Sequence, residues 1–295
     1  MRPSIRLGTV SGIQIGLHWS IFLIGFVLVS ALTGTILPTL VPGLGGTAYL
    51  LAAVSTAILF LASIVAHELG HSIVAQRNDI KVQGITLFAL GGVAALERDP
   101  DDPGAAARIA LAGPAVSVGI GALSLLMSSV LGTLGAGALV TAAFTWLGII
   151  NLALAAFNMI PALPLDGGRV LQAYLWKRGG DRHRATISAA KLGGWFGWAI
   201  VAFGLWQFFQ VGTGLWTVLI GWFVISAAGA ERARARWHLR RRRMVSQGEP
   251  WPLGFSQMWT GDAPPSRPTS PHYIDVTGRP VSDDAVGRSV NSQAG

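Results

Sequence analysis

Long apolar runs dominate the pattern of hydrophobic and polar positions along this chain. A run of about 20 apolar residues is long enough to cross the hydrocarbon core of a membrane as a helix. Six runs predict membrane-spanning helices, at residues 17–37, 48–77, 104–134, 135–160, 187–209 and 213–230. The pattern therefore predicts an all-α polytopic membrane protein.

A polar segment, residues 78–103, separates the second and third apolar runs. Within it, residues 80–95 contain several β-branched side chains and are interrupted by Gly84 and by Gly91 and Gly92. β-Branched residues are enriched in strands, and glycine permits tight bends. We therefore expect a small membrane-associated β region between the second and third helices.

The composition and the charges support a membrane location. Of the 295 residues, 51% are hydrophobic and 12% are charged, whereas soluble domains carry about 25% charged residues. The net charge is +8, but the basic residues cluster beside the apolar runs, so we expect a topology signal and no nucleic-acid partner. The positive-inside rule places both termini and residues 78–103 in the cytosol. Together with the Arg and Ala content, this predicts a multi-pass protein of a bacterial plasma membrane.

The C-terminal part of the chain differs from the apolar core. Residues 231–243 hold seven arginines, which favours a basic juxtamembrane segment on anionic lipid over a nucleic-acid site. Residues 244–295 are rich in Pro, Ser, Gly and Asp and poor in large apolar residues, which predicts a disordered cytosolic tail. The sequence thus divides into a membrane core at residues 1–230, the basic segment and the tail.

Three polar residues interrupt the second apolar run, where His67, Glu68 and His71 spell H-E-x-x-H. Helical residues four apart share a face, so the two imidazoles can bind one zinc ion. Glu68 is placed to take a proton from a water on the metal and to pass it to a leaving amine. A chance occurrence is the poorer explanation, because polar groups at membrane depth are costly without a partner or a function.

A third ligand is expected, because a catalytic zinc ion usually has three protein ligands and one open position. The chain has no Cys, which leaves His, Asp and Glu. Asp166 follows the fourth apolar run, between prolines and the pair Gly167 and Gly168. Prolines interrupt a helix and glycines allow close backbone approach, so this carboxylate can reach back to the second helix. The alternative is a turn residue paired with Arg169.

Two asparagines, Asn151 and Asn158, lie seven residues apart and so share a face of the fourth predicted helix. Asn158 can donate a hydrogen bond to an oxyanion, orient Asp166 or satisfy a neighbouring backbone group. The sequence leaves these three roles open.

Several segments together resemble the site-2 protease family of intramembrane zinc metalloproteases, over residues 5–190. The matching segments are GIQIGLHWS (12–20), HELGH (67–71), LGGVAALE (90–97), IALAGPAVS (109–117) and NLALAAFNMIPALPLDGGRVL (151–171). One acidic residue that is frequent in the family just before IALAGP is replaced here by Ala106. We find no segment long enough for the PDZ insertion of many relatives, and the tail is short for their paired nucleotide-sensing domain.

The resemblance implies a role for each candidate residue. His67, His71 and Asp166 would ligate one zinc ion, Glu68 would act as the acid/base, and Asn158 would help to stabilise the intermediate.

The resemblance also implies that Gly91, Gly92 and Val93 belong to a strand near the active site. The substrate would be a single-span membrane protein, cut in or near its transmembrane segment in regulated intramembrane proteolysis. Such a helix must unwind, and the strand can offer an edge to the freed backbone. The alternative is a non-proteolytic metal-binding protein or transporter, but transporters usually show internal repeats and several ionisable groups along a path.

Overall fold

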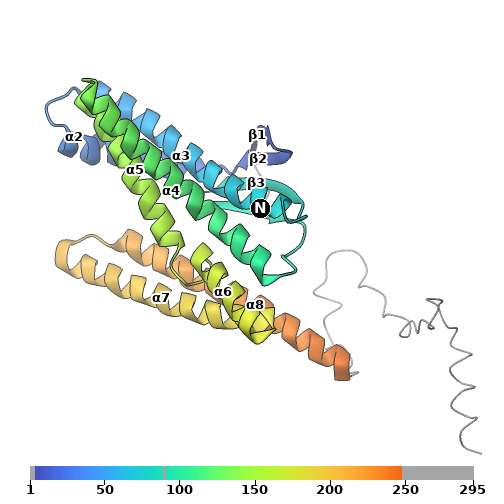
Figure 1. Ribbon diagram of the computed structural model, residues 1–295. Coiled ribbons are helices and arrows are strands. Elements are labelled where there is room, and N and C mark those ends of the chain that lie inside the picture. The colour runs from blue at the N-terminus through green and yellow to red at the C-terminus, as the bar shows by residue number, and fades with distance from the viewer. Residues whose placement is uncertain (1–3, 89–90, 248–295) are drawn as a thin grey trace, which may run out of the picture. The chain divides into compact units, whose positions relative to one another are not determined.

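The computed structural model describes residues 4–88 and 91–247, and most of them are helical (Figure 1). Contacts divide the chain into two units, Met1–Arg240 and Arg241–Gly295, and the site lies in the first. The predicted tail is almost wholly outside the described residues.

The elements are β1 (Ile5–Val10), β2 (Ile13–Leu17), α1 (Ser20–Ala31), the π-helical turn η1 (Leu32–Ile36), α2 (Leu37–Leu40), α3 (Gly46–Gln76), β3 (Val82–Phe88), β4 (Gly91–Leu96), α4 (Pro103–Thr133), α5 (Ala138–Asn158), α6 (Asp166–Gly179), α7 (Arg182–Val211) and α8 (Leu215–Gln247).

Within residues 4–88 and 91–247, five helical stretches are long and apolar enough to cross a membrane, namely Ser20–Leu40, Gly46–Gln76, Pro103–Thr133, Ala138–Asn158 and Arg182–Val211. Large apolar side chains on them are exposed, including Phe26, Trp195 and Phe209 at 70%, 76% and 80%. These observations confirm the mostly helical, multi-pass membrane fold. The sixth expected span, residues 213–230, is not among the five. It forms the first part of α8, which continues as a helix into the basic segment, and it stays a prediction.

One helix boundary differs from the expectation. The first span does not end at residue 37, because η1 leads into α2, which runs to Leu40. Pro38 lies in the first turn of α2, directly after the π-helical turn η1. The helix α6 begins at Asp166, so Gly167 and Gly168 belong to its first turn.

The sheet is larger than the sequence predicts. The β region is not confined to the segment between the second and third helices, since β1 and β2 join β3 and β4 in the order β1-β2-β3-β4. β2 pairs parallel with β3, and Gln14 lies opposite Gly84. Ile13 of β2 is buried in one cluster with Ile85 of β3. This pairing joins segments that α1 and α3 separate in the sequence, so no local pattern announces it.

Helix α4 packs against α3 and α5 through small residues. A Cβ added to Gly70 of α3 would lie 3.0 Å from the carbonyl oxygen of Ala112. A Cβ on Gly121 of α4 would lie 3.1 Å from the Gly148 carbonyl oxygen of α5. Small residues allow membrane helices to approach this closely. One face of α4 is thereby held against the part of α3 that carries the two histidines.

Candidate metal centre

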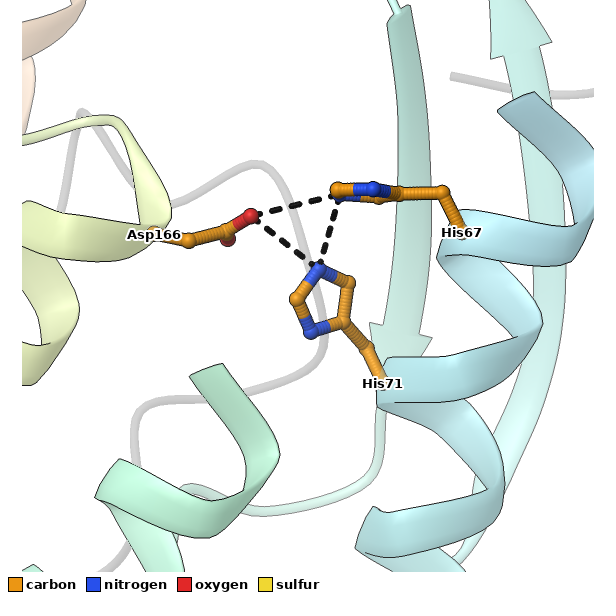
Figure 2. A group of neighbouring side chains, drawn as sticks. All are labelled: His67, His71 and Asp166. Carbon is orange, nitrogen blue, oxygen red and sulfur yellow. Dashed lines mark hydrogen bonds and ion pairs between the residues drawn. The ribbon is translucent and has the colours of Figure 1, made fainter. Parts of the chain in front are cut away.

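Helix α3 carries His67 and His71 one turn apart, and their rings face the same space (Figure 2). The two Nε2 atoms are 3.2 Å apart, and the ring planes meet at 78°. His67 is 5% exposed. The helical pitch alone therefore brings two imidazole nitrogens together inside the protein.

Asp166 approaches these nitrogens from α6. Its Oδ2 lies 3.2 Å from His67 Nε2 and 3.3 Å from His71 Nε2 (Figure 2). The first turn of α6 lies directly on the chain before it, because a Cβ on Gly167 or Gly168 would overlap the backbone of residues 159–163. The carboxylate thus has the histidines as its partners, and the close backbone approach expected at the two glycines is present.

The three ligand atoms form a nearly equilateral triangle, with edges of 3.2, 3.2 and 3.3 Å. A tetrahedral zinc ion with bonds of about 2.0–2.1 Å separates its ligands by about 3.3–3.4 Å. Among the residues that the structure describes, His67, His71 and Asp166 form the candidate metal group. The spacing of the three side chains, as they stand, therefore fits a zinc ion.

The charge state of Asp166 also suits a metal ligand. Burial raises the pKa of this carboxyl group, but the neighbouring His67 and His71 side chains lower it by more and hold the pKa at about 2. The carboxylate is therefore ionised at neutral pH, as a metal ligand must be.

Helix α4 contacts both imidazoles from the other side. His71 Nδ1 donates to the carbonyl oxygen of Ile109 at 2.7 Å, and His67 Nδ1 lies 2.9 Å from Ser117 Oγ. A carbonyl oxygen only accepts, so the His71 proton is on Nδ1 and the Nε2 lone pair faces the other ligands. A Cβ on Gly113 would lie 2.6 Å from His67 Nε2 and would overlap His71 Nε2. Any side chain at that position would thus intrude on the candidate metal-binding atoms.

Ile109, Gly113 and Ser117 are absent from the site residues predicted from the sequence. Their spacing of four residues places them on one stripe of a helix, inside the segment IALAGPAVS. That spacing, equal to the spacing of the two histidines, is the signal that could have found them.

Glu68 lies between the metal group and the sheet. A Cβ added to Gly92 of β4 would be 2.7 Å from Glu68 Cδ and 2.9 Å from its Oε1. The residues expected to bind substrate, Gly91, Gly92 and Val93, are the first three of β4. Gly91 has a φ of +132°, which favours glycine. The structure thus brings this strand against the expected acid/base residue, while the Val93 side chain lies outside the described part.

The two asparagines of α5 have different surroundings. Asn151 is fully buried, and its Nδ2 donates to the Leu147 carbonyl at 2.8 Å. Asn158 is the last residue of α5. Within the described ranges, no hydrogen bond joins its side chain to Asp166 or to the histidines. A direct orienting bond to Asp166 is therefore not found, and donation to a substrate oxygen stays a prediction.

Comparisons with known proteins identify the family to which this chain belongs. Residues 55–138 and 131–200 match the model described as Peptidase family M50, and they include every residue of the predicted metal and catalytic set. Rip3 of Mycobacterium tuberculosis, named as a zinc metalloprotease, is 40% identical over 236 residues, which are 79% of this chain and 60% of Rip3. The protein sll0528 of Synechocystis, named likewise, is 41% identical over 240 residues, covering 80% of this chain and 62% of that protein. This chain therefore spans less than two thirds of the length of these relatives.

A solved structure, "Site-2 Protease from Methanocaldococcus jannaschii", matches with a TM-score of 0.53 and 30% identity. The match covers 77% of this chain and 94% of that one. The resemblance noted in the sequence, and zinc as the cofactor of the family, are thus confirmed. The chain belongs to peptidase family M50, the site-2 protease family of zinc metalloproteases.

Proposed function

We propose that this chain is a zinc-dependent intramembrane endopeptidase that hydrolyses a peptide bond in or near the transmembrane segment of a single-span membrane protein. The observation that carries the proposal is the triangle of His67, His71 and Asp166, which lies among membrane helices with Glu68 beside it. The activity would serve regulated intramembrane proteolysis, in which a membrane-bound regulator is released.

The chemistry follows from the side chains around the triangle. His67, His71 and Asp166 would hold a zinc ion, which would lower the pKa of water toward about 7 and polarise a peptide carbonyl. Glu68 accepts the proton of the attacking water and passes it to the leaving amine. Asn158 donates an N–H to the developing oxyanion, a contribution of about 2.7–4 kcal/mol when the donor is well placed.

The open edge of the sheet offers a place for the unwound substrate. The Leu87 carbonyl accepts from the backbone N–H of His18 at 2.8 Å, so the backbone groups of Leu87 point away from β4. Its partner in β4 is Gly92. Because directly opposed residues alternate between bonded and non-bonded pairs, the N–H and C=O of Gly92 face the open edge. Gly92 also contacts Glu68, so a peptide added at this edge would lie beside the acid/base residue.

Strand addition removes the main energetic obstacle to cutting a membrane helix. Unwound backbone in lipid costs several kcal/mol for each unsatisfied polar group. The N–H and C=O groups at the β4 edge would satisfy those of the substrate, as in other β-augmentation complexes.

The orientation of the chain follows from its charges. The positive-inside rule supports cytosolic termini in the plasma membrane of a bacterium, with residues 231–243 on anionic lipid. The metal centre lies in the last third of α3, which this orientation places toward the cytosol. A released fragment would then enter the cytosol or stay tethered at its surface.

The test compares the wild type with Glu68→Gln, each expressed with candidate single-span proteins and analysed by mass spectrometry of their fragments. The wild type should produce new ends in or near a transmembrane segment, and the variant should keep its zinc but produce none. Continued cleavage by the variant would remove Glu68 from its role. Zinc transport into vesicles without any cleavage would favour the transporter alternative.

A second experiment tests the strand edge. Ala94 follows Gly92 by two residues and so presents its N–H on the same side. We expect Ala94→Pro to lower cleavage and leave zinc content unchanged, because proline removes an edge donor and no bond to β3. Val93→Pro is the contrasting variant, since Val93 pairs with Thr86 and its loss would disturb the hairpin itself. Full cleavage by Ala94→Pro would contradict the edge model.

A further inference from the structure

Helix α4 meets the two imidazoles along the stripe formed by Ile109, Gly113 and Ser117. The carbonyl oxygen of Ile109 accepts the Nδ1–H of His71, and Ser117 Oγ lies 2.9 Å from Nδ1 of His67. Gly113, midway between them, faces both Nε2 atoms. The outer nitrogens of both rings are therefore contacted from one helix.

The two rings are not held in the same way. The partner of His71 is the backbone carbonyl of residue 109, which is present whatever side chain that residue carries. The position of the His71 proton therefore does not depend on the side chain of residue 109. His67 depends on a side chain, because its partner is a hydroxyl that can donate or accept. Ser117 is 0% exposed and His67 is 5% exposed, so bulk water cannot replace that hydroxyl.

We propose that Ser117 is a positioning residue of the zinc centre, whose hydroxyl oxygen accepts the Nδ1–H of His67 and so directs the Nε2 lone pair toward the metal. This inference rests on the zinc centre of the proposed function. A serine hydroxyl keeps two acceptor lone pairs on its oxygen whichever way its own proton points, so this oxygen can accept from the imidazole. Without the hydroxyl, His67 would keep a buried N–H without an acceptor, or would move its proton to Nε2 and block the ligand position.

The test measures zinc affinity of the purified full chain by competition with a chelator. Partners that orient a metal-bound histidine typically contribute 10–100-fold in affinity, so Ser117→Ala should weaken zinc binding by about 10–100-fold. Ser117→Thr should restore most of the affinity, because it keeps the hydroxyl. Ser124→Ala is the matched control, since Ser124 is another buried serine of α4 and contacts neither histidine in the described part of the chain.

Cobalt(II) in place of zinc provides a second readout, because its d–d absorption bands report the ligand geometry. The bands should change in Ser117→Ala and stay unchanged in Ser124→Ala. If Ser117→Ala does not fold, Ser117→Cys replaces it with the same expected loss, since a thiol accepts hydrogen bonds weakly.

Three results would count against the positioning role of Ser117 or the zinc centre itself. Wild-type affinity and bands in Ser117→Ala would overturn the role, and equal losses in Ser117→Ala and Ser117→Thr would assign the effect to packing and overturn it as well. A wild-type protein that binds no zinc would instead refute the proposed function, so the two failures are distinguishable.

Discussion

The two sides of the metal triangle are built by different means. His67 and His71 come from one helix, whose pitch brings them together, and α4 contacts the outer nitrogen of each ring. Asp166 stands at the start of α6, after a connection broken by Pro161 and Pro164. We call these the histidine side and the aspartate side.

Backbone contacts of glycine residues position the aspartate side. Gly167 and Gly168 lie on the backbone of residues 159–163. From α7, Gly193 lies against the carbonyl of Leu163, which an added Cβ would overlap. The histidine side thus depends on hydrogen bonds within a helix pair, whereas the aspartate side depends on how closely three stretches of backbone approach. This difference predicts that substitutions on the two sides will have different effects on zinc content and on stability.

The largest effect is expected from Gly113→Ala on the histidine side. The new methyl group would overlap His71 Nε2 and lie 2.6 Å from His67 Nε2, so zinc content should fall to background and cleavage should stop. Gly119→Ala is the control, because a Cβ there meets nothing within 4 Å on the same helix. Metal analysis of the purified variants decides, and full zinc content in Gly113→Ala would show that the triangle is not the metal site.

A smaller effect is expected from Gly193→Ala on the aspartate side. Overpacking of this kind costs about 1–3 kcal/mol, and the displaced Leu163 should move Asp166 and weaken zinc binding without removing it. The adjacent Gly194→Ala meets nothing within 4 Å and should gain up to about 1 kcal/mol from helix propensity.

Thermal unfolding and chelator competition, measured on Gly193→Ala and Gly194→Ala, test whether the two neighbouring substitutions differ in stability and in zinc affinity. If both alanines behave alike, α7 does not support the aspartate.

The two sides also differ in how far the sequence predicts them. The pairing of His67 with His71 follows from local pitch, and Asp166 stands out because prolines and glycines surround an acidic residue in an apolar region. The contact of Gly193 with Leu163 and the pairing of β2 with β3 could not be predicted, because they join segments far apart in the sequence. A local pattern tells which face a residue occupies, but not which distant backbone will lie against it.

An exposed ion pair links the two sides. Asp99 follows β4, the strand that contacts Glu68, and Arg182 begins α7, the helix that carries Gly193. The Arg182 Nη2 atom lies 2.8 Å from Asp99 Oδ1, and the Asp99 side chain is 71% exposed. A pair as exposed as this one contributes about 0.2–1 kcal/mol.

The smallest effect is therefore expected from Arg182→Gln, and its pH dependence identifies it. Burial raises the pKa of Asp99, but the hydrogen bond and charge of Arg182, together with Arg169 and His183, bring the pKa below its usual value. The folded protein thus binds this proton less tightly than the unfolded chain, whose aspartate pKa is about 3.9. The ion pair therefore stabilises the folded protein fully at a pH above the pKa of the unfolded chain. This stabilisation is lost as the pH falls through the lower pKa of Asp99 in the folded protein. The difference in melting temperature between wild type and Arg182→Gln should be constant from about pH 7 to 5 and should decrease in stronger acid. A difference that does not decrease there would mean that Arg182 supports α7 by packing and that the link between the two sides is not electrostatic.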